Sequence, residues 1–320
     1  MIELLKKAAN SVGLDVVGVA PAINEVVGQY PWARSVLCAA ISYLPPECAD
    51  EDDQPRGLVA RFARSIDYHK VLHEKLTAVA GLIVRFRSDA RLVVCVDTCP
   101  LPERKLAVLS GIAWPSKNGN VFVDGLGSWV ALGEIVTDLP LISDAEPQLS
   151  RCGSCTICMQ TCPAGAIVEP GAIDRSRCIS ALTQASGSID TGFRELMGTN
   201  IYGCDICQQV CPHNKNIQPL TPEFAEAVFP GKSPALLPLL GLTAAEYKTC
   251  VAESSIGWLR RTRIRRNAAI GVGNLLCEAA VDALEVVCLD ENTILREAAG
   301  WAINKIRNAG SLPKDENRLR

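Results

Sequence analysis

The sequence lacks the usual signatures of nucleotide-derived cofactors. It contains neither the phosphate-binding pattern G-x-x-x-x-G-K-[ST] nor the dinucleotide pattern G-x-G-x-x-G. Histidine is scarce, with three among 320 residues. His69 and His73 are four residues apart, but they do not form H-E-x-x-H, which argues against a zinc protease. Any organic cofactor must therefore bind through another kind of site.

Long apolar runs are also missing. No stretch reaches the roughly 18 to 20 consecutive apolar residues that a membrane-spanning helix requires. The first residues, M-I-E-L-L-K-K-A-A-N, contain neither the apolar core nor the cleavage site of a secretory signal. We therefore expect a cytoplasmic protein without membrane contact, in a compartment where thiols stay reduced. The net charge of −3 gives no overall indication of nucleic-acid binding.

Cysteine, by contrast, is abundant, with 15 in the chain. Residues 152–163 read C-x2-C-x2-C-x3-C-P, and residues 204–212 read C-x2-C-x3-C-P. This is the ligand pattern of bacterial two-cluster ferredoxins, in which the fourth cysteine of each run serves the other [4Fe–4S] cluster. The second run lacks one cysteine, which Cys178 can supply. We assign cluster 1 to Cys152, Cys155, Cys158 and Cys211, and cluster 2 to Cys162, Cys178, Cys204 and Cys207.

Other uses of these cysteines stay open. Thiolates also bind zinc, and zinc ribbons contain paired C-x2-C, although zinc requires neither the third cysteine nor the repeated x3-Cys-Pro ending. A single cluster with a degenerate second site is another alternative. The odd number of cysteines and the reducing compartment argue against disulfides. The remaining cysteines are expected to be free and mostly buried thiols: Cys38, Cys48, Cys95, Cys99, Cys250, Cys277 and Cys288.

The first 145 residues alternate helical and strand-like patterns, which predicts an α/β (α+β) domain at 1–145. Helical patterns cover 2–10, 67–86 and 103–110, and strand-like runs cover 16–20, 35–43, 92–97, 121–124 and 129–136. The acidic, Pro-rich segment 45–57 is expected to be an exposed loop.

Two further regions are predicted. Residues 146–220 form a loop-rich, ferredoxin-like module for the two clusters. Residues 221–320 are mostly helical, and 265–274 resembles 295–304, a thirty-residue repeat that is typical of HEAT-like helix pairs. Because a solenoid normally needs at least three units, we expect this short helical region to lean on the cluster module.

Asp97 is the strongest catalytic candidate. It ends the predicted strand 92–97 and begins the run D-T-C-P-L-P-E-R, and a carboxylate that leaves a buried strand lies where α/β sheets commonly place their sites. We expect partial burial to raise the pKa of Asp97 and allow it to donate a proton. The alternative is an aspartate that only caps the next turn. A second group of polar residues lies near by in the sequence: Arg61, Asp67, Tyr68 and His69.

Local positive charge is concentrated in the helical region. Five arginines fall within seven residues: Arg260, Arg261, Arg263, Arg265 and Arg266. Arg318 and Arg320 add charge at the end of the sequence. Such a cluster can neutralise nucleic-acid phosphates. The alternative is a solvated helix start without a partner.

Together these features resemble the epoxyqueuosine reductases, a family of cobalamin-dependent iron–sulfur enzymes that complete queuosine in tRNA. The resemblance rests on motifs between Gly57 and Asn214: A-R-F-A-R-S-I-D-Y-H-K-V-L, V-D-T-x-P, G-S-W-V-A-L-G-E-I-V-T-D-L-P-L, C-G-S-C-T-I-C and M-G-T-N-I-Y-G-C-D-I-C-Q-Q-V-C-P-H-N. The last motif is specific, because a generic ferredoxin has no need of Y-G-C-D-x-C-Q. The remote cysteine of the family matches Cys178.

The resemblance implies a base-off cobalamin between the α/β domain and the cluster module. Electrons from an external donor such as ferredoxin or flavodoxin would pass through the clusters to cobalt, and Asp97 would protonate the departing epoxide oxygen. Cobalamin contacts are expected from Arg61, Asp97, Thr98, Cys99, Lys117, Asn118 and Ser128, and substrate contacts from Asp67, Tyr68 and His69. The helical region and its arginines would hold the tRNA backbone, and the target base would leave its stack to enter the site.

Two other functions stay open. Departures from the family pattern, such as Cys99 where Gly or Ala is usual, allow a paralogous reductase with another substrate. A non-enzymatic protein that transfers electrons or reactivates corrinoid proteins is the other alternative. An electron carrier would bind clusters and no corrin.

Overall fold

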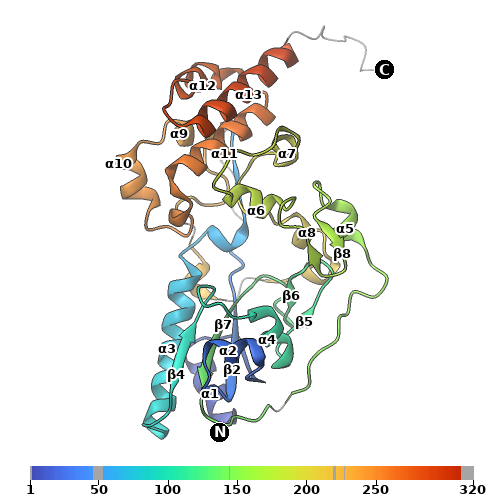
Figure 1. Ribbon diagram of the computed structural model, residues 1–320, viewed down its shortest axis with the longest axis vertical. Coiled ribbons are helices and arrows are strands. Elements are labelled where there is room, and N and C mark those ends of the chain that lie inside the picture. Colours follow the sequence, from blue (N-terminus) through green and yellow to red (C-terminus); the bar gives the residue numbers. More distant parts are fainter. Residues whose placement is uncertain (1, 46–52, 144, 219–220, 227, 311–320) are drawn as a thin grey trace. The chain divides into compact units, whose positions relative to one another are not determined.

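The computed structural model describes residues 2–45, 53–143, 145–218, 221–226 and 228–310 (Figure 1). The chain packs into two compact units, each built from several segments. The first unit comprises Met1–Pro46, Ser65–Asp174 and Asp205–Ala227, and the second comprises Glu47–Arg64, Arg175–Cys204 and Val228–Arg320. This division by packing differs from the consecutive regions 1–145, 146–220 and 221–320, which stay a prediction about function.

A four-stranded sheet forms the centre of the first unit. Its order is β1 (Val16–Pro21), β2 (Ser35–Ser42), β7 (Val130–Thr137) and β4 (Leu92–Cys95). All three neighbouring pairs are antiparallel. Every residue of β2 is buried, which explains why its sequence is a continuous run of small and apolar residues. The predicted mixture of helices and strands is confirmed in its α+β form.

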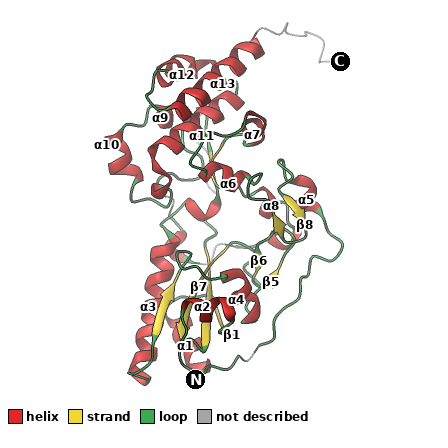
Figure 2. Ribbon diagram, viewed as in Figure 1, coloured by secondary structure: helices red, strands yellow, loops and turns green. Residues whose placement is uncertain are grey.

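Helices cover both faces of this sheet (Figure 2). They are α1 (Ile2–Ser11), α2 (Asn24–Gln29), α3 (Tyr68–Phe86) and α4 (Glu103–Leu109). On the face covered by α1 and α3, Gly133 of β7 lets Leu76 approach the sheet. On the face covered by α2 and α4, Gly18 of β1 faces the carbonyl of Ser110. A β-carbon at either glycine would clash, so both are required for close packing of helix on sheet.

Helix α3 confirms the predicted helical pattern. Its buried residues recur every three or four positions: Val71, Leu72, Leu76, Val79, Ala80 and Ile83. The helix begins directly after Asp67, whose carboxylate accepts a hydrogen bond from the backbone N–H of His69. This cap satisfies one of the free amides of the first turn and fixes the Asp67 side chain.

The rest of the first unit is rich in loops, as expected for the cluster-binding segments. Short strands pair as β5 (Trp114–Pro115) with β6 (Val121–Phe122) and as β8 (Ile167–Glu169) with β9 (Ala172–Ile173). The helices here are α5 (Ile157–Thr161), α8 (Ile206–Gln209), η2 (Pro212–Asn214) and η3 (Pro222–Phe224).

The second unit is mostly helical. A short parallel pair joins β3 (Leu58–Val59) to β10 (Asn200–Tyr202). The helices are η1 (Arg61–Ala63), α6 (Ile179–Gln184), α7 (Thr191–Leu196), α9 (Leu236–Leu240), α10 (Ala244–Glu246), η4 (Tyr247–Val251), η5 (Gly257–Leu259), α11 (Arg260–Asn274), η6 (Glu278–Ala280), α12 (Val281–Val287) and α13 (Thr293–Gly310). No described helix is long and apolar enough to cross a membrane.

The two segments of the predicted repeat lie on α11 and α13, which pack against each other. Ala268 and Ala298 occupy equivalent positions, and both are buried. Gly273 of α11 lies so close to Ala302 of α13 that a β-carbon would clash. Small residues therefore bring the two helices together. Residues 46–52 of the predicted acidic loop, and Arg318 and Arg320, lie outside the described residues.

Candidate active site and cluster-binding site

Asp97 lies in a tight loop just beyond β4. Its backbone φ of +53° is in the left-handed region, and its N–H donates to Glu103 Oε1 at 2.6 Å. Both features turn the Asp97 side chain outward, where 60% of it is exposed. Because β4 is antiparallel to its neighbour, the rule for parallel sheets does not account for this position. The loop geometry does.

His69, the second residue of α3, lies between two carboxylates. Its Nδ1 is 2.7 Å from Asp67 Oδ1, and its Nε2 is 3.2 Å from Asp97 Oδ2. Tyr68 stacks on the imidazole with ring centroids 4.0 Å apart. The structure thus brings together the predicted catalytic residue and the three residues predicted to contact substrate.

The hydrogen bonds decide where the proton of this group resides. Those with Asp67 and then Asp97 raise the pKa of His69 to about 9, against the opposing effect of burial. The hydrogen bond from His69 holds the pKa of Asp97 below its usual value and outweighs burial. At neutral pH, therefore, His69 is protonated and Asp97 is ionised. The expected rise in the pKa of Asp97 was wrong, because the sequence did not reveal the adjacent imidazolium.

Two glutamates next to Asp97, half-buried Glu103 and fully buried Glu134, were not identified from the sequence. Burial, with a further contribution from the negative charge of Asp97, raises the pKa of Glu103 to about 7. Glu134 of β7 is 0% exposed, and in the described part of the chain neither carboxylate oxygen has a hydrogen-bond partner. Burial and then the charges of Glu103 and Asp97 raise the pKa of Glu134 well above its usual value. The sequence feature that could have revealed Glu134 is its position as the one charged residue in the apolar run W-V-A-L-G-E-I-V.

Cys95 and Cys99 form a disulfide that brackets Asp97, with their Cα atoms 5.6 Å apart. The prediction that both are free thiols was wrong, because the turn C-V-D-T-C returns the chain to the end of β4. Among the described residues the free state is confirmed for Cys38, Cys250, Cys277 and Cys288. Cys48 lies outside the described residues.

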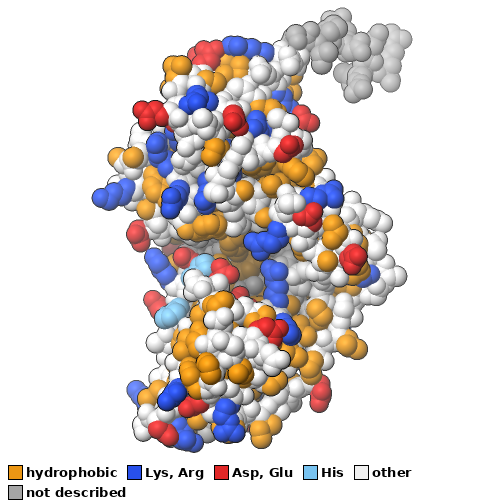
Figure 3. Space-filling model, viewed as in Figure 1, with side chains coloured by type: hydrophobic (Ala, Val, Ile, Leu, Met, Phe, Trp, Pro, Cys, Tyr) orange, Lys and Arg blue, Asp and Glu red, His pale blue; other side chains and the backbone are white. Residues whose placement is uncertain are grey.

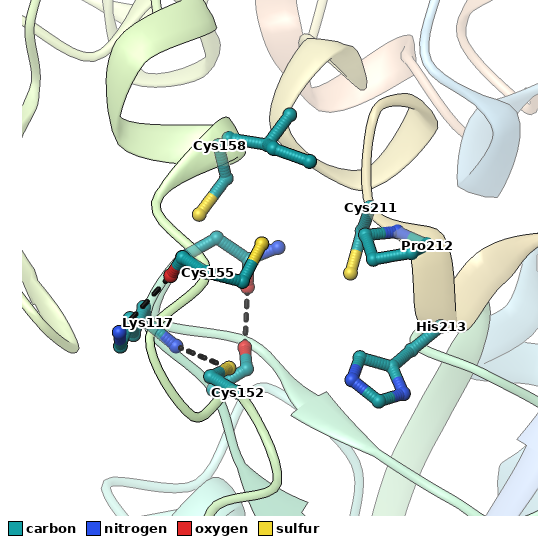
Figure 4. Close-up of a pocket in the computed structure, with 10 residues that line it drawn as sticks. Lys117, Cys152, Cys155, Cys158, Cys211, Pro212 and His213 are labelled. Atoms are coloured by element: carbon teal, nitrogen blue, oxygen red, sulfur yellow. Dashed lines mark hydrogen bonds between the residues drawn. The ribbon is translucent and has the colours of Figure 1, made fainter.

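The four cysteines assigned to cluster 1 line one pocket (Figure 4): Cys152, Cys155, Cys158 and Cys211. Their sulfur atoms point toward a common space, as four thiolates around one iron–sulfur cluster would. Burial raises the pKa of the Cys158 and Cys211 thiols, so cluster binding would displace protons from them. The spacing-based assignment, which takes Cys211 from the second run, therefore fits the geometry.

Lys117, predicted to contact cobalamin, is bonded to the segment that holds cluster 1. Its Nζ donates to the carbonyls of Gly153 (2.6 Å) and Cys155 (3.0 Å). Its backbone N–H donates to Cys152 Sγ at 3.5 Å. Lys117 therefore fixes the cluster-binding loop and adds a positive charge beside it.

Asn118 and Ser128 are also engaged with the cluster-binding segments. Both are buried, at 5% and 4% exposure. Asn118 Nδ2 donates to the Cys207 carbonyl at 3.2 Å. Ser128 Oγ donates to Gln208 Oε1, and its N–H donates to Asn214 Oδ1, both at 2.8 Å. These bonds tie the β5–β6 turn and the segment just before β7 to α8 and η2, which a sequence pattern could not reveal.

The predicted ligands of cluster 2 are distributed between the units. Cys162 and Cys207 belong to the first, and Cys178 and Cys204 belong to the second. Their joint assignment stays a prediction from spacing. Of the remaining predicted cobalamin contacts, Thr98 is exposed in the Asp97 loop, and Arg61 lies in η1 of the second unit.

Helix α11 divides the arginine run between interior and surface. Arg266 is 1% exposed, and its guanidinium donates to four carbonyls at the end of α6. These belong to Leu182, Thr183, Ala185 and Gly187. Arg265 is 7% exposed and donates to Asp290 Oδ2 at 2.6 Å. Both side chains hold the second unit together, so their assignment to tRNA was wrong.

The other three arginines are accessible. Arg260 is exposed, and Arg261 and Arg263 are half-buried. In Figure 3, Lys and Arg side chains gather on the surface near α10. The burial of Arg266 lowers its pKa to about 10, which still leaves it charged at neutral pH. Only part of the predicted basic cluster can therefore meet a phosphate backbone.

Family models match both parts of this site. Residues 151–214 match the 4Fe-4S double cluster binding domain, which supports iron–sulfur clusters over zinc. Residues 26–98 match "Epoxyqueuosine reductase QueG, DUF1730". The epoxyqueuosine reductase of Bacillus subtilis is 36% identical over 282 residues, which cover 86% of this chain and 72% of the relative. That of Salmonella typhimurium is 37% identical over 281 residues, which cover 85% and 72%.

Solved structures give the same relationship. An epoxyqueuosine reductase with an epoxyqueuosine-modified tRNA-Tyr stem loop has a TM-score of 0.88 and 31% identity, over 98% of this chain and 95% of the other. The Bacillus subtilis enzyme, described with its catalytic aspartate loop swung out of the active site, has a TM-score of 0.88 and 30% identity, over 98% and 95%. The predicted resemblance is confirmed: the chain belongs to the epoxyqueuosine reductase family of oxidoreductases.

Proposed function

We propose that this chain reduces epoxyqueuosine to queuosine at the wobble position of tRNA. Membership of the family supports the reaction, and the relative solved with a modified stem loop supports the substrate. Within this chain, the observation that carries the proposal is the hydrogen bond between Asp97, on an exposed loop, and His69 of α3. The reaction consumes two electrons and two protons and releases the epoxide oxygen as water. A tRNA substrate would place the reaction in the cytoplasm.

The residues predicted to hold a cobalamin include no histidine. Both ring nitrogens of His69 are engaged by carboxylates, and His213 packs edge-on against Trp114 at 4.9 Å between ring centroids. Thr98, Cys99 and Lys117 would touch the corrin, and Arg61 stays a predicted contact. Asn118 and Ser128, being buried, would support it through the cluster-binding segments. When bound, cobalamin would supply the electrons for cleavage of the epoxide C–O bond.

Asp97 and His69 would deliver the protons. At neutral pH the pair holds one proton on His69, 3.2 Å from Asp97 Oδ2. Asp97 can take up that proton and pass it to the departing oxygen, because hydrogen-bond reach is the first requirement for general acid catalysis. Asp67 would orient the imidazole, and Tyr68 would stack beside it.

The two clusters would bring electrons singly from an external donor of the ferredoxin or flavodoxin class. The convergence of four sulfurs in one pocket of the first unit supports this role for cluster 1. The HEAT-like helices α11–α13 would hold the tRNA, with Arg260, Arg261 and Arg263 facing its phosphates.

The test is an anaerobic assay with reconstituted protein, cobalamin, a strong reductant and epoxyqueuosine-containing tRNA. Nucleosides are then read by mass spectrometry. Loss of one oxygen from the modified base is expected. No conversion, with both clusters and cobalamin bound, would point instead to a paralogous reductase. No conversion and no cobalamin binding would point to an electron carrier.

A further inference from the structure

The bond between Cys95 and Cys99 has no role in the reaction proposed above, although it encloses Asp97 and although Cys99 is one of the predicted cobalamin contacts. We infer that this pair is a reversible redox-modification site, reduced by a thioredoxin-like dithiol, whose bond fixes the loop that carries Asp97. The expected effect of the disulfide on turnover rests on the proposed function of Asp97. The expected effect of the disulfide on the motion of the loop does not depend on that function.

The two ends of the ring are anchored differently. Cys95 is the last residue of the edge strand β4, pairs with Glu134 across the sheet and is 1% exposed. Cys99 is half-buried in the loop. The bond therefore ties a loop residue to the rigid edge of the sheet. The loop has a second anchor, because the N–H of Asp97 donates a hydrogen bond to the Glu103 carboxylate.

This asymmetry sets the order of thiol–disulfide exchange. Cys99 is partly exposed, so an incoming thiolate attacks there, whereas Cys95 is only 1% exposed. Cys95 then leaves as a thiolate, to which the Tyr30 hydroxyl, 3.7 Å away, can donate a hydrogen bond. The second thiol of the reductant displaces Cys99 from the mixed disulfide. Two electrons and two protons are transferred, so the products are two protein thiols and one oxidised dithiol. Exchange in the reverse direction, with the disulfide of an oxidised dithiol of the same class, takes the two electrons and two protons back and re-forms the bond.

The surroundings favour a labile bond. The other cysteines that the structure describes are free, and cluster ligation requires thiolates. The chain must therefore work where thiols stay reduced. In such compartments disulfides are typically transient, and they act in catalysis or redox sensing. The turn between Cys95 and Cys99 brings the two sulfurs together, so oxidation needs no rearrangement of the fold.

The bond would restrict a motion for which a relative gives precedent. The Bacillus subtilis enzyme is described with its catalytic aspartate loop swung out of the active site. A similar swing here would pull Cys99 away from β4, which the closed ring opposes. The oxidised form keeps Asp97 beside His69, and the reduced form lets Asp97 move with the substrate. Opening or closing the ring would therefore change how Asp97 delivers its proton, while leaving the clusters in place.

Hydrogen exchange on the reconstituted full chain tests the inference. The disulfide form is prepared by mild oxidation and confirmed by mass spectrometry of the peptide that contains Cys95 and Cys99. It is then compared with the form reduced by thioredoxin. We expect the amides of residues 96–99 and 101 to exchange about tenfold faster after reduction, the order expected for opening a short covalent loop. Cys99→Ser should show the faster rate in both preparations.

Cys38→Ala is the matched control, because Cys38 is buried in the same row of the sheet and is free. It should respond to reduction as the natural sequence does. Equal exchange in the oxidised and reduced forms, or failure of the two cysteines to bond on oxidation, would overturn the inference. The exchange is measured without tRNA, so a loop that responds in a protein that converts no epoxyqueuosine would refute the proposed function and leave the inference standing.

Discussion

At the scale of single residues, Asp67 controls the proton that Asp97 and His69 share. The imidazolium has a carboxylate at each end, at 2.7 Å from Nδ1 and 3.2 Å from Nε2. Asp67 is itself fixed, because it caps α3. The proton is therefore held at a defined position next to Asp97. An aspartate without this histidine would have no neighbouring proton to take up.

The first prediction concerns Asp97, the carboxylate proposed to protonate the substrate. We expect Asp97→Asn to keep its cluster content and its tRNA affinity but to lose at least about 10²-fold in turnover, the usual contribution of a general acid. Single-turnover conversion of epoxyqueuosine tRNA would measure the loss. Asp89→Asn, an exposed carboxylate paired with Arg87, serves as the control and should be unaffected. Full turnover in Asp97→Asn would remove Asp97 from the mechanism.

The second prediction concerns the position of the proton. Carboxylates raise the pKa of His69 to about 9, so its contribution to stability is complete below the ordinary pKa of about 6.5 and is lost as pH rises toward 9. An NMR titration of the His69 ring should show a midpoint near 9 in the natural sequence. In Asp97→Asn the midpoint should fall, because one carboxylate is gone.

An unchanged His69 midpoint in Asp97→Asn would show that the two side chains do not interact in solution. Loss of turnover in that variant would then need another explanation. The titration thus separates the contact from the catalytic role, since it requires neither cobalamin nor tRNA.

The sequence predicted these residues unevenly, for physical reasons. Asp97 was found because a carboxylate follows an apolar strand, but its pKa depends on His69, twenty-eight positions earlier in the chain. The two glutamates next to Asp97 were missed. In the sequence, Glu103 has the pattern of a residue that begins a helix, and Glu134 is a single polar residue within a strand. Only the tertiary structure places these groups close enough for their charges to interact.

At the scale of elements, α11 shows why a run of charge does not define a surface. Successive residues of a helix point in different directions, so five arginines in seven positions cannot all face a partner. Arg266 turns inward to the carbonyl end of α6, where the helix dipole favours a cation. The helical pattern was predictable. Which face would be covered was not, because α6 lies about eighty residues earlier in the chain.

The third prediction compares two arginines of this helix. Arg266→Leu should lower the free energy of unfolding by about 3 kcal/mol, because several buried carbonyls lose their donor. Urea unfolding of the reconstituted protein would measure this. Arg263→Ala should leave the urea midpoint unchanged, weaken tRNA binding and reduce the salt slope by about 1. An unchanged salt slope would assign Arg263 to a solvated face, and an unchanged midpoint in Arg266→Leu would contradict its structural role.

At the scale of the whole molecule, the compact units do not follow the order of the sequence. The predicted helices and strands occur close to where the patterns place them, yet each compact unit takes segments from distant parts of the chain. In the second unit, β3 pairs with β10 across about 140 residues. Local patterns record which segments are helical or extended. Local patterns carry no information about which distant segments pair, so the division into units could not be derived from them.

Cluster ligation also belongs to this scale, because the cysteines assigned to each cluster come from both runs. The fourth prediction is that Cys211→Ser removes the same cluster as Cys152→Ser, although the two residues belong to different runs. Each variant should lose about half of the iron and the same one of two EPR signals, as expected when three ligands of one run share a cluster with one ligand of the other. Cys162→Ser should remove the other signal.

The exposed Cys250 gives the control, and Cys250→Ser should keep all iron. The informative comparison is between two variants of the first run. If Cys162→Ser and Cys152→Ser abolished the same signal, each run would serve its own cluster, and the pocket formed with Cys211 would not be a ligand set. If they abolish different signals, the two runs are joined through both clusters. Loss of either cluster should then also lower the thermal stability, because each one would connect segments that the sequence keeps apart.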